Sequence, residues 1–85
     1  MKVIKNDKGF KIMAIDRATM AVKLNSPGIC DSCMATPHIG YYVAVLNCWL
    51  CPDCFRDWYN NATNYPEDQA IETKYFNWTK QMIER

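Results

Sequence analysis

The sequence predicts a small α+β domain whose fold depends on a bound zinc ion. The chain has 85 residues, which is enough for one domain with a small apolar core. Four of its five cysteines form two Cys-x-x-Cys pairs, an arrangement typical of a structural zinc site. Strand-like runs and helix-start signals occur along the same chain, so both kinds of element are expected around the metal.

The first segment, residues 1–27, is expected to form a strand followed by a helix. Residues 10–15 alternate loosely between apolar and other side chains, as a half-buried strand does. Asp16 then suits a helix N-cap, because its carboxylate can accept hydrogen bonds from amides of the first turn. The helix would cover residues 17–24. In a competing interpretation, residues 20–24 are instead the second strand of a hairpin.

The central segment, residues 28–60, contains the cysteine pairs and is expected to fold around them. The first pair lies in a turn. Residues 41–46 are aromatic and β-branched and form the clearest strand of the sequence, with a short return strand at 49–50. A helix is expected to begin at Pro52, since proline is favoured at the first helical position, and to end near Tyr59.

The last segment, residues 65–85, is expected to be an amphipathic helix over 66–84. Proline followed by two acidic residues marks its start. Apolar side chains then recur at helical spacing, and they are Ile71, Tyr75, Trp78 and Met82. We expect this stripe to pack against the zinc-binding segment, so that residues 1–85 form a single domain. The alternative is that part of the stripe contacts a partner.

The predicted metal ligands are Cys30, Cys33, Cys51 and Cys54. Seventeen residues separate the two pairs. Thiolates are soft ligands that bind zinc strongly, and four of them complete a tetrahedral shell. A complete shell has no open position for water or substrate. One structural Zn²⁺ is therefore the expected cofactor.

The order of these features resembles a treble-clef zinc finger, in which a cysteine turn, a hairpin and a helix follow one another. The spacing of the cysteines is similar to that of GATA-type fingers, and the layout is similar to the halves of LIM domains. The resemblance covers residues 28 to 60. The whole chain also resembles small uncharacterised treble-clef proteins of bacteria and their mobile elements. The resemblance implies a fold and not one function, because treble clefs serve many roles.

Other interpretations of the cysteines remain open. An iron site of the rubredoxin type normally has glycine after each pair, whereas this chain has Met34 and Phe55. His38 could replace one cysteine as a ligand. Cys48 is either a small buried residue or a spare ligand beside the site. A disulfide framework is disfavoured, because five cysteines leave one unpaired.

Charge and composition exclude several functional classes. The formal net charge is +1, and a zinc ion on four thiolates would bring it to about −1, so a general polyanion binder is not expected. No apolar run is long enough for a membrane span or a signal peptide, which predicts a cytoplasmic protein without a membrane partner. No Ser-His-Asp set, phosphate loop or open metal position is apparent, so the chain is not expected to be an enzyme.

The aromatic residues indicate a protein partner. They exceed what one small core is expected to hide, and they include Tyr41, Tyr42, Trp49, Trp58, Tyr59, Tyr65, Tyr75, Phe76 and Trp78. Tyrosine and tryptophan are favoured at protein interfaces. The sequence therefore predicts a zinc-stabilised interaction or adaptor module, and a small regulator or inhibitor is a narrower form of the same hypothesis.

Nucleic-acid binding of the GATA type is the second candidate function. A DNA-reading finger carries basic residues on and after its helix. In this helix Arg56 is offset by Asp57, and the next segment contains Glu67 and Asp68, so the pattern disfavours this role. Four lysines near the N-terminus could still contact phosphates, and they are Lys2, Lys5, Lys8 and Lys11.

Overall fold

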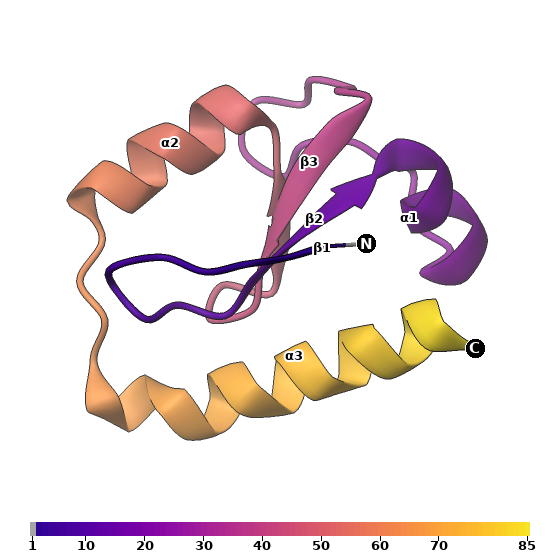
Figure 1. Ribbon diagram of the computed structural model, residues 1–85. Coiled ribbons are helices and arrows are strands. Elements are labelled where there is room, and N and C mark those ends of the chain that lie inside the picture. Colours follow the sequence, from indigo (N-terminus) through magenta and orange to yellow (C-terminus); the bar gives the residue numbers. More distant parts are fainter. Residues whose placement is uncertain (1) are drawn as a thin grey trace.

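A four-stranded antiparallel sheet runs through the middle of the molecule, with helices on both of its faces (Figure 1). This computed structural model describes residues 2–85. The strands lie side by side in chain order, and they are β1 (Lys2–Ile4), β2 (Ile12–Asp16), β3 (Ile39–Val43) and β4 (Cys48–Leu50). The helices are α1 (Arg17–Lys23), α2 (Pro52–Asn61) and α3 (Gln69–Glu84), and a short 3₁₀ helix, η1 (Pro66–Asp68), precedes α3. The predicted α+β class is confirmed.

The segment after β2 is a helix, so the hairpin interpretation of residues 20–24 is wrong. Asp16 ends β2 and caps α1, as predicted: its carboxylate accepts from the Thr19 amide at 3.1 Å and from the Thr19 hydroxyl at 2.5 Å. These hydrogen bonds lower the pKa of Asp16. A local cap of this kind stabilises a helix by about 1 kcal/mol. That local stabilisation favours the helix over the competing strand.

Strand β1 was not predicted from the sequence. It pairs with β2 in the register Lys2↔Ala14, Val3↔Met13 and Ile4↔Ile12. Asn6 closes the connection between the two strands, because its side-chain amide imitates a strand partner for Phe10. The amide nitrogen donates to the Phe10 carbonyl at 2.8 Å, and the amide oxygen accepts from the Phe10 N–H at 3.0 Å.

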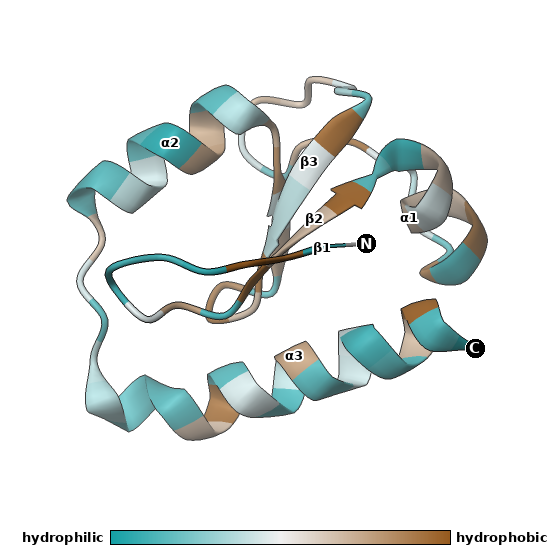
Figure 2. Cartoon of the chain, in the orientation of Figure 1, coloured by the Kyte–Doolittle hydropathy of each residue, from teal (hydrophilic) through white to brown (hydrophobic). Residues whose placement is uncertain are grey.

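The two faces of the sheet bury separate apolar clusters. The first cluster lies with α1 and α3, and its buried members are Met13, Ile15, Met20, Tyr42, Ala44 and Trp49. The second lies with α2, and its buried members are Cys30, Val43, Leu50 and Cys51. Adjacent strand residues Tyr42 and Val43 belong to different clusters, as the period-two alternation of a strand requires. Figure 2 shows brown, apolar segments on β1, on β2 and at one end of β3, and a mostly teal, hydrophilic α2.

The buried face of helix α3 overlaps the predicted stripe only in part: Tyr75 packs on the core as predicted and Met82 is half-buried, but Ile71 and Trp78 are exposed. Ile71 and Trp78 are 46% and 56% exposed, whereas Glu72 and Thr79 are 2% and 1% exposed. The buried face is shifted by one residue, and Tyr75, Phe76 and Ile83 complete it. The Glu72 carboxylate accepts from the Lys11 amide at 3.0 Å, so a charged residue that an apolar pattern assigns to the surface lies inside. Helix α3 also packs on the sheet face opposite the cysteines. The expectation that it packs on the segment that contains the cysteine pairs is therefore wrong.

Candidate metal centre

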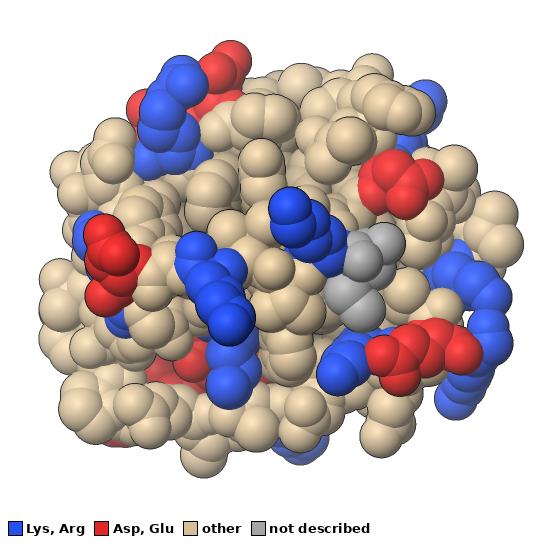
Figure 3. Space-filling view, in the orientation of Figure 1, with Lys and Arg blue, Asp and Glu red and all other residues tan. Residues whose placement is uncertain are grey.

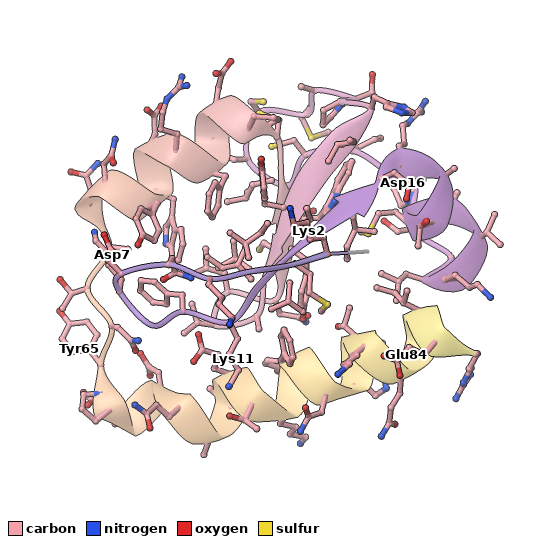
Figure 4. All side chains as sticks on the ribbon, in the orientation of Figure 1. Lys2, Asp7, Lys11, Asp16, Tyr65 and Glu84 are labelled. Atoms are coloured by element: carbon pink, nitrogen blue, oxygen red, sulfur yellow. The ribbon has the colours of Figure 1, made fainter. Side chains whose placement is uncertain are left out.

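The structure brings the four predicted ligands together at one edge of the sheet. The Sγ atoms of Cys30, Cys33, Cys51 and Cys54 all lie within 4.8 Å of one another. Figure 4 shows sulfur atoms gathered near the first turn of α2. The fold therefore brings together two cysteine pairs that are far apart in the sequence, and it places their four thiol groups around one point.

The spacing of these sulfurs fits a tetrahedral metal ion. Zinc–sulfur bonds of about 2.3 Å in a tetrahedron place the sulfurs about 3.8 Å apart. The Sγ atoms of Cys33 and Cys51 are 3.6 Å apart, whereas a disulfide needs about 2.05 Å. All five cysteines are free thiols. The donor set and its size therefore match an ion of the zinc class.

The first pair lies in a tight turn that the backbone stabilises. The Met34 amide donates to the Cys30 carbonyl at 3.0 Å, and the Cys30 amide donates to the Ala35 carbonyl at 2.7 Å. The Ser32 amide points at the Cys30 sulfur at 3.4 Å. Met34 has a φ of 67°, a left-handed conformation that costs a non-glycine residue about 1–2 kcal/mol. Met34 thus adopts the left-handed backbone conformation that glycine usually adopts.

The second pair begins α2, as the proline signal predicted. Cys51 is the N-cap of the helix, and its sulfur accepts from the Cys54 amide at 3.5 Å. Pro52 occupies the first helical position. The positive end of the helix dipole and its free amides favour thiolate charge at this place. A structural metal bound here would fix the start of α2 against the sheet.

Asp31 joins the first turn to β4 and was missed as a site residue. Its backbone N–H donates to the Trp49 carbonyl at 3.0 Å, and its carboxylate accepts from the Trp49 N–H at 2.9 Å. This reciprocal pair holds Cys30 next to the strand that leads into Cys51. The only sequence signal was a carboxylate between two ligands, which by itself does not predict a backbone partner.

The electrostatics of the site favour a bound cation. Burial acts to raise the pKa of Cys30, but hydrogen bonds from three backbone amides outweigh it and lower this pKa to about 6. The neighbouring thiols of Cys33 and Cys51 raise the pKa of Cys54 to about 12. For Cys33 the Ala35 amide acts to lower the pKa, yet the thiols of Cys51 and Cys30 leave it raised. The Cys33 and Cys54 thiols therefore retain their protons when no cation is bound. A divalent cation that binds the four sulfurs would displace these protons.

The two additional ligand candidates lie outside this group. Within residues 2–85 the four cysteines are the only cluster of His, Cys, Asp or Glu side chains close enough to share a metal. His38 is exposed, and its carbonyl accepts from the Arg17 amide at 2.8 Å. The Cys48 thiol donates to the Leu46 carbonyl at 3.3 Å. Burial, followed by the nearby Asp31 carboxylate, raises the pKa of Cys48, which makes it less reactive as a nucleophile.

Comparisons with protein families, with curated proteins and with solved structures found no match to this chain. The centre is therefore interpreted from its geometry. No helix among residues 2–85 is long and apolar enough to cross a membrane.

Proposed function

We propose that residues 1–85 form one zinc-binding domain of the treble-clef type that serves as a protein-interaction module. The observation that carries the metal assignment is the group of four sulfurs within 4.8 Å, supplied by a turn and by a helix start. The sequence order of turn, β3–β4 hairpin and α2 supports the treble-clef assignment. A reducing compartment such as the cytoplasm would keep the thiols available for the metal.

The proposed role of the metal is structural. Four thiolates fill a tetrahedral shell, so the ion would have no position left for a reacting group. Cys30 and Cys51 are themselves members of the buried cluster under α2. The ion would therefore tie the first turn, the hairpin and α2 into one packed unit. We propose a binding role and no enzymatic one on this basis.

Zinc is proposed over iron, although both accept four thiolates. The missing glycine after the first pair does not discriminate between them, because Met34 adopts the left-handed conformation itself. Elemental analysis of the purified chain tests the assignment directly. We expect one zinc per chain and a colourless protein. A red protein with one iron per chain would contradict the assignment.

The interaction role rests on exposed apolar and aromatic side chains. Of the nine aromatic residues named above, Tyr65 and Trp78 are more than half exposed, at 52% and 56%. Tyr42 and Trp49 are buried, and several of the rest pack on other aromatic rings, as Tyr41 does on Phe55 with ring centroids 4.6 Å apart. The aromatic surplus is thus smaller than the sequence suggested, and the proposal depends on the surface residues.

The nucleic-acid alternative loses one of its four lysines. The Lys8 ammonium donates to the Tyr59 carbonyl and, at 2.8 Å, to the Ala62 carbonyl, so it caps the end of α2. Co-purification of the zinc-loaded chain with a stoichiometric protein after nuclease treatment would support the interaction role. Recovery of nucleic acid in place of protein would contradict it.

A further inference from the structure

The two edges of the sheet differ in whether their backbone is covered. At β4 the Trp49 N–H and carbonyl are both paired with Asp31, so the first cysteine turn covers that edge. At the other side β1 has β2 as its one strand neighbour. An edge strand of this kind presents backbone N–H and C=O groups that another extended segment can pair with.

A hollow lies beside the open edge, between the β1–β2 hairpin and α3. Its volume is about 550 Å³, and its lining includes the apolar side chains of Val3 and Phe76. Val3 is 45% exposed although it belongs to a strand. The hollow is therefore large enough for one or two apolar side chains of a segment laid along β1.

The same hollow has a basic rim. Lys5, Lys11 and Lys80 line it, and none of its lining residues is acidic. The Lys11 ammonium lies 5.7 Å from the centre of the Phe76 ring, and Lys80 has only a 4.0 Å, exposed pair with Glu84. Figure 3 shows basic side chains across the middle of this face and acidic ones mostly toward its margins. In Figure 4, Lys2 lies on β1, and Lys11 lies between the β1–β2 hairpin and α3.

We infer that β1 is a docking edge for an extended, acidic segment of a partner protein, which adds as a fifth strand and places an apolar side chain in the hollow. The inference rests on the proposed interaction role and names its partner chemistry. Main-chain pairing would supply affinity, and the lysines would select glutamate or aspartate two residues away from the apolar side chain, on the same face of the strand.

A second copy of this chain does not fit this edge. Antiparallel pairing of two β1 strands would bring the lysines of both copies, Lys2 and Lys5, to one edge, and like charges gathered in this way oppose pairing. A nucleic acid could use the lysines but not the open backbone edge or the apolar hollow. An acidic peptide uses all three features.

The test measures binding to the zinc-loaded chain of a short, fluorescein-labelled peptide, Thr-Glu-Thr-Val-Thr-Glu-Thr, in which the valine and both glutamates lie on one strand face. We expect saturable binding that weakens with salt, and amide shift changes confined to β1, Lys11 and the facing residues of α3. Methylating alternate peptide nitrogens on the edge-facing side should weaken binding by at least about tenfold, since it removes main-chain donors without altering charge. A peptide with lysine in place of glutamate should not bind.

Two protein variants locate the site. The double variant Lys5→Glu with Lys11→Glu should weaken peptide binding by at least about tenfold. The control is Lys74→Glu, a charge reversal on α3 away from the docking edge. Lys74 lines a separate hollow with Asn47 and Trp78. This variant should change peptide binding by no more than about twofold. Zinc content and thermal unfolding are measured on each variant, so a loss of binding is read only in a folded, metal-loaded chain.

Three patterns of binding would overturn the inference, in addition to a failure to bind at all. In the first, the N-methylated peptide binds as tightly as the unmethylated one, which would show charge attraction alone. In the second, a single-stranded oligonucleotide of equal charge binds more tightly than the peptide. In the third, the chain forms concentration-dependent dimers that exclude the peptide. A zinc-loaded, cooperatively folded chain that fails to bind the peptide would refute the docking edge and leave the structural zinc intact. A chain without metal would refute the proposed function itself.

Discussion

Trp49 is the residue through which the cysteine turn and the main core meet. Its backbone pairs with Asp31 in both directions, and its indole N–H donates to the Ile15 carbonyl at 3.1 Å. The side chain is 2% exposed. The indole also lies directly over Gly40, where a Cβ atom would stand less than 3.0 Å from three of its atoms. A tryptophan that seemed available to a partner is thus fixed inside the fold.

This contact predicts the effect of Gly40→Ala. The added methyl group has to displace a buried indole, so we expect a loss of about 1–3 kcal/mol in the free energy of unfolding, measured by urea denaturation. In a Trp49→Phe background the ring is smaller, and the same change should cost less. An equal cost in both backgrounds would show that Gly40 matters for a reason other than the indole.

At the scale of an element, α3 shows how a one-residue shift changes the buried face. The adjacent residues Trp78 and Thr79 provide a matched pair. Trp78→Lys should change the free energy of unfolding by about 0.5 kcal/mol or less, because the site is exposed. Thr79→Lys should cost about 2 kcal/mol or more, because it places a charge in a buried position. The reverse order in urea denaturation would mean that the predicted stripe, and not the observed one, faces the sheet.

The turn and the helix start that form the metal centre together predict a pH dependence. In the folded site the pKa values of Cys33 and Cys54 are raised, and in an unfolded, metal-free segment a thiol has its ordinary pKa of about 8.5. In either state both thiols are protonated at neutral pH, so metal binding must displace at least their two protons. The metal-bound form carries fewer protons, so zinc affinity rises with pH. Near neutrality we expect a rise of at least about a hundredfold per pH unit, from two protons at tenfold each.

Chelator competition at several pH values measures this slope, after correction for the chelator's own protons. Cys48→Ser should have the same slope as the natural chain, because Cys48 lies outside the sulfur cluster. A slope near zero would indicate that the thiols are already deprotonated or are not the ligands.

The elements predicted correctly from the sequence were those with local chemical signals. Asp16 and Pro52 mark helix starts through a side-chain cap and a fixed φ angle, and the spacing of the cysteines predicted which four would meet. Strand β1 has no such signal: it is three residues long with a lysine at its start, and pairing with β2 defines it. The buried face of α3 was missed because Glu72 and Thr79 occupy it, and burial of polar residues depends on tertiary partners.

At the scale of the whole molecule, the sheet separates two packed layers that share its strands. One layer is apolar in the ordinary way, with α1 and α3 on Met13, Ile15 and Trp49. The other contains Cys30 and Cys51 among its buried residues, so its packing includes two of the four proposed metal ligands. A chain of 85 residues has little apolar surface to spare. We therefore expect the α2 layer to need the metal more than the α3 layer does.

Two cysteine variants separate the ligand group from the fifth thiol. Cys54→Ser removes one proposed ligand and should abolish stoichiometric zinc binding and cooperative thermal unfolding. Cys48→Ser should retain both, because the Cys48 thiol donates to the Leu46 carbonyl and lies outside the four-sulfur cluster. Loss of zinc in the Cys48 variant with retention in the Cys54 variant would reassign the second pair.

The central claim, that one structural metal ion holds this fold together, is tested most directly by thermal unfolding of one sample before and after complete chelation under reducing conditions. Metal content is measured on the same sample. We predict one zinc per chain, loss of the cooperative transition with unfolding of residues 28–60 after chelation, and recovery when zinc is returned, since structural zinc contributes about 10–16 kcal/mol in comparable small sites. An unchanged transition in a fully metal-free chain would contradict the claim.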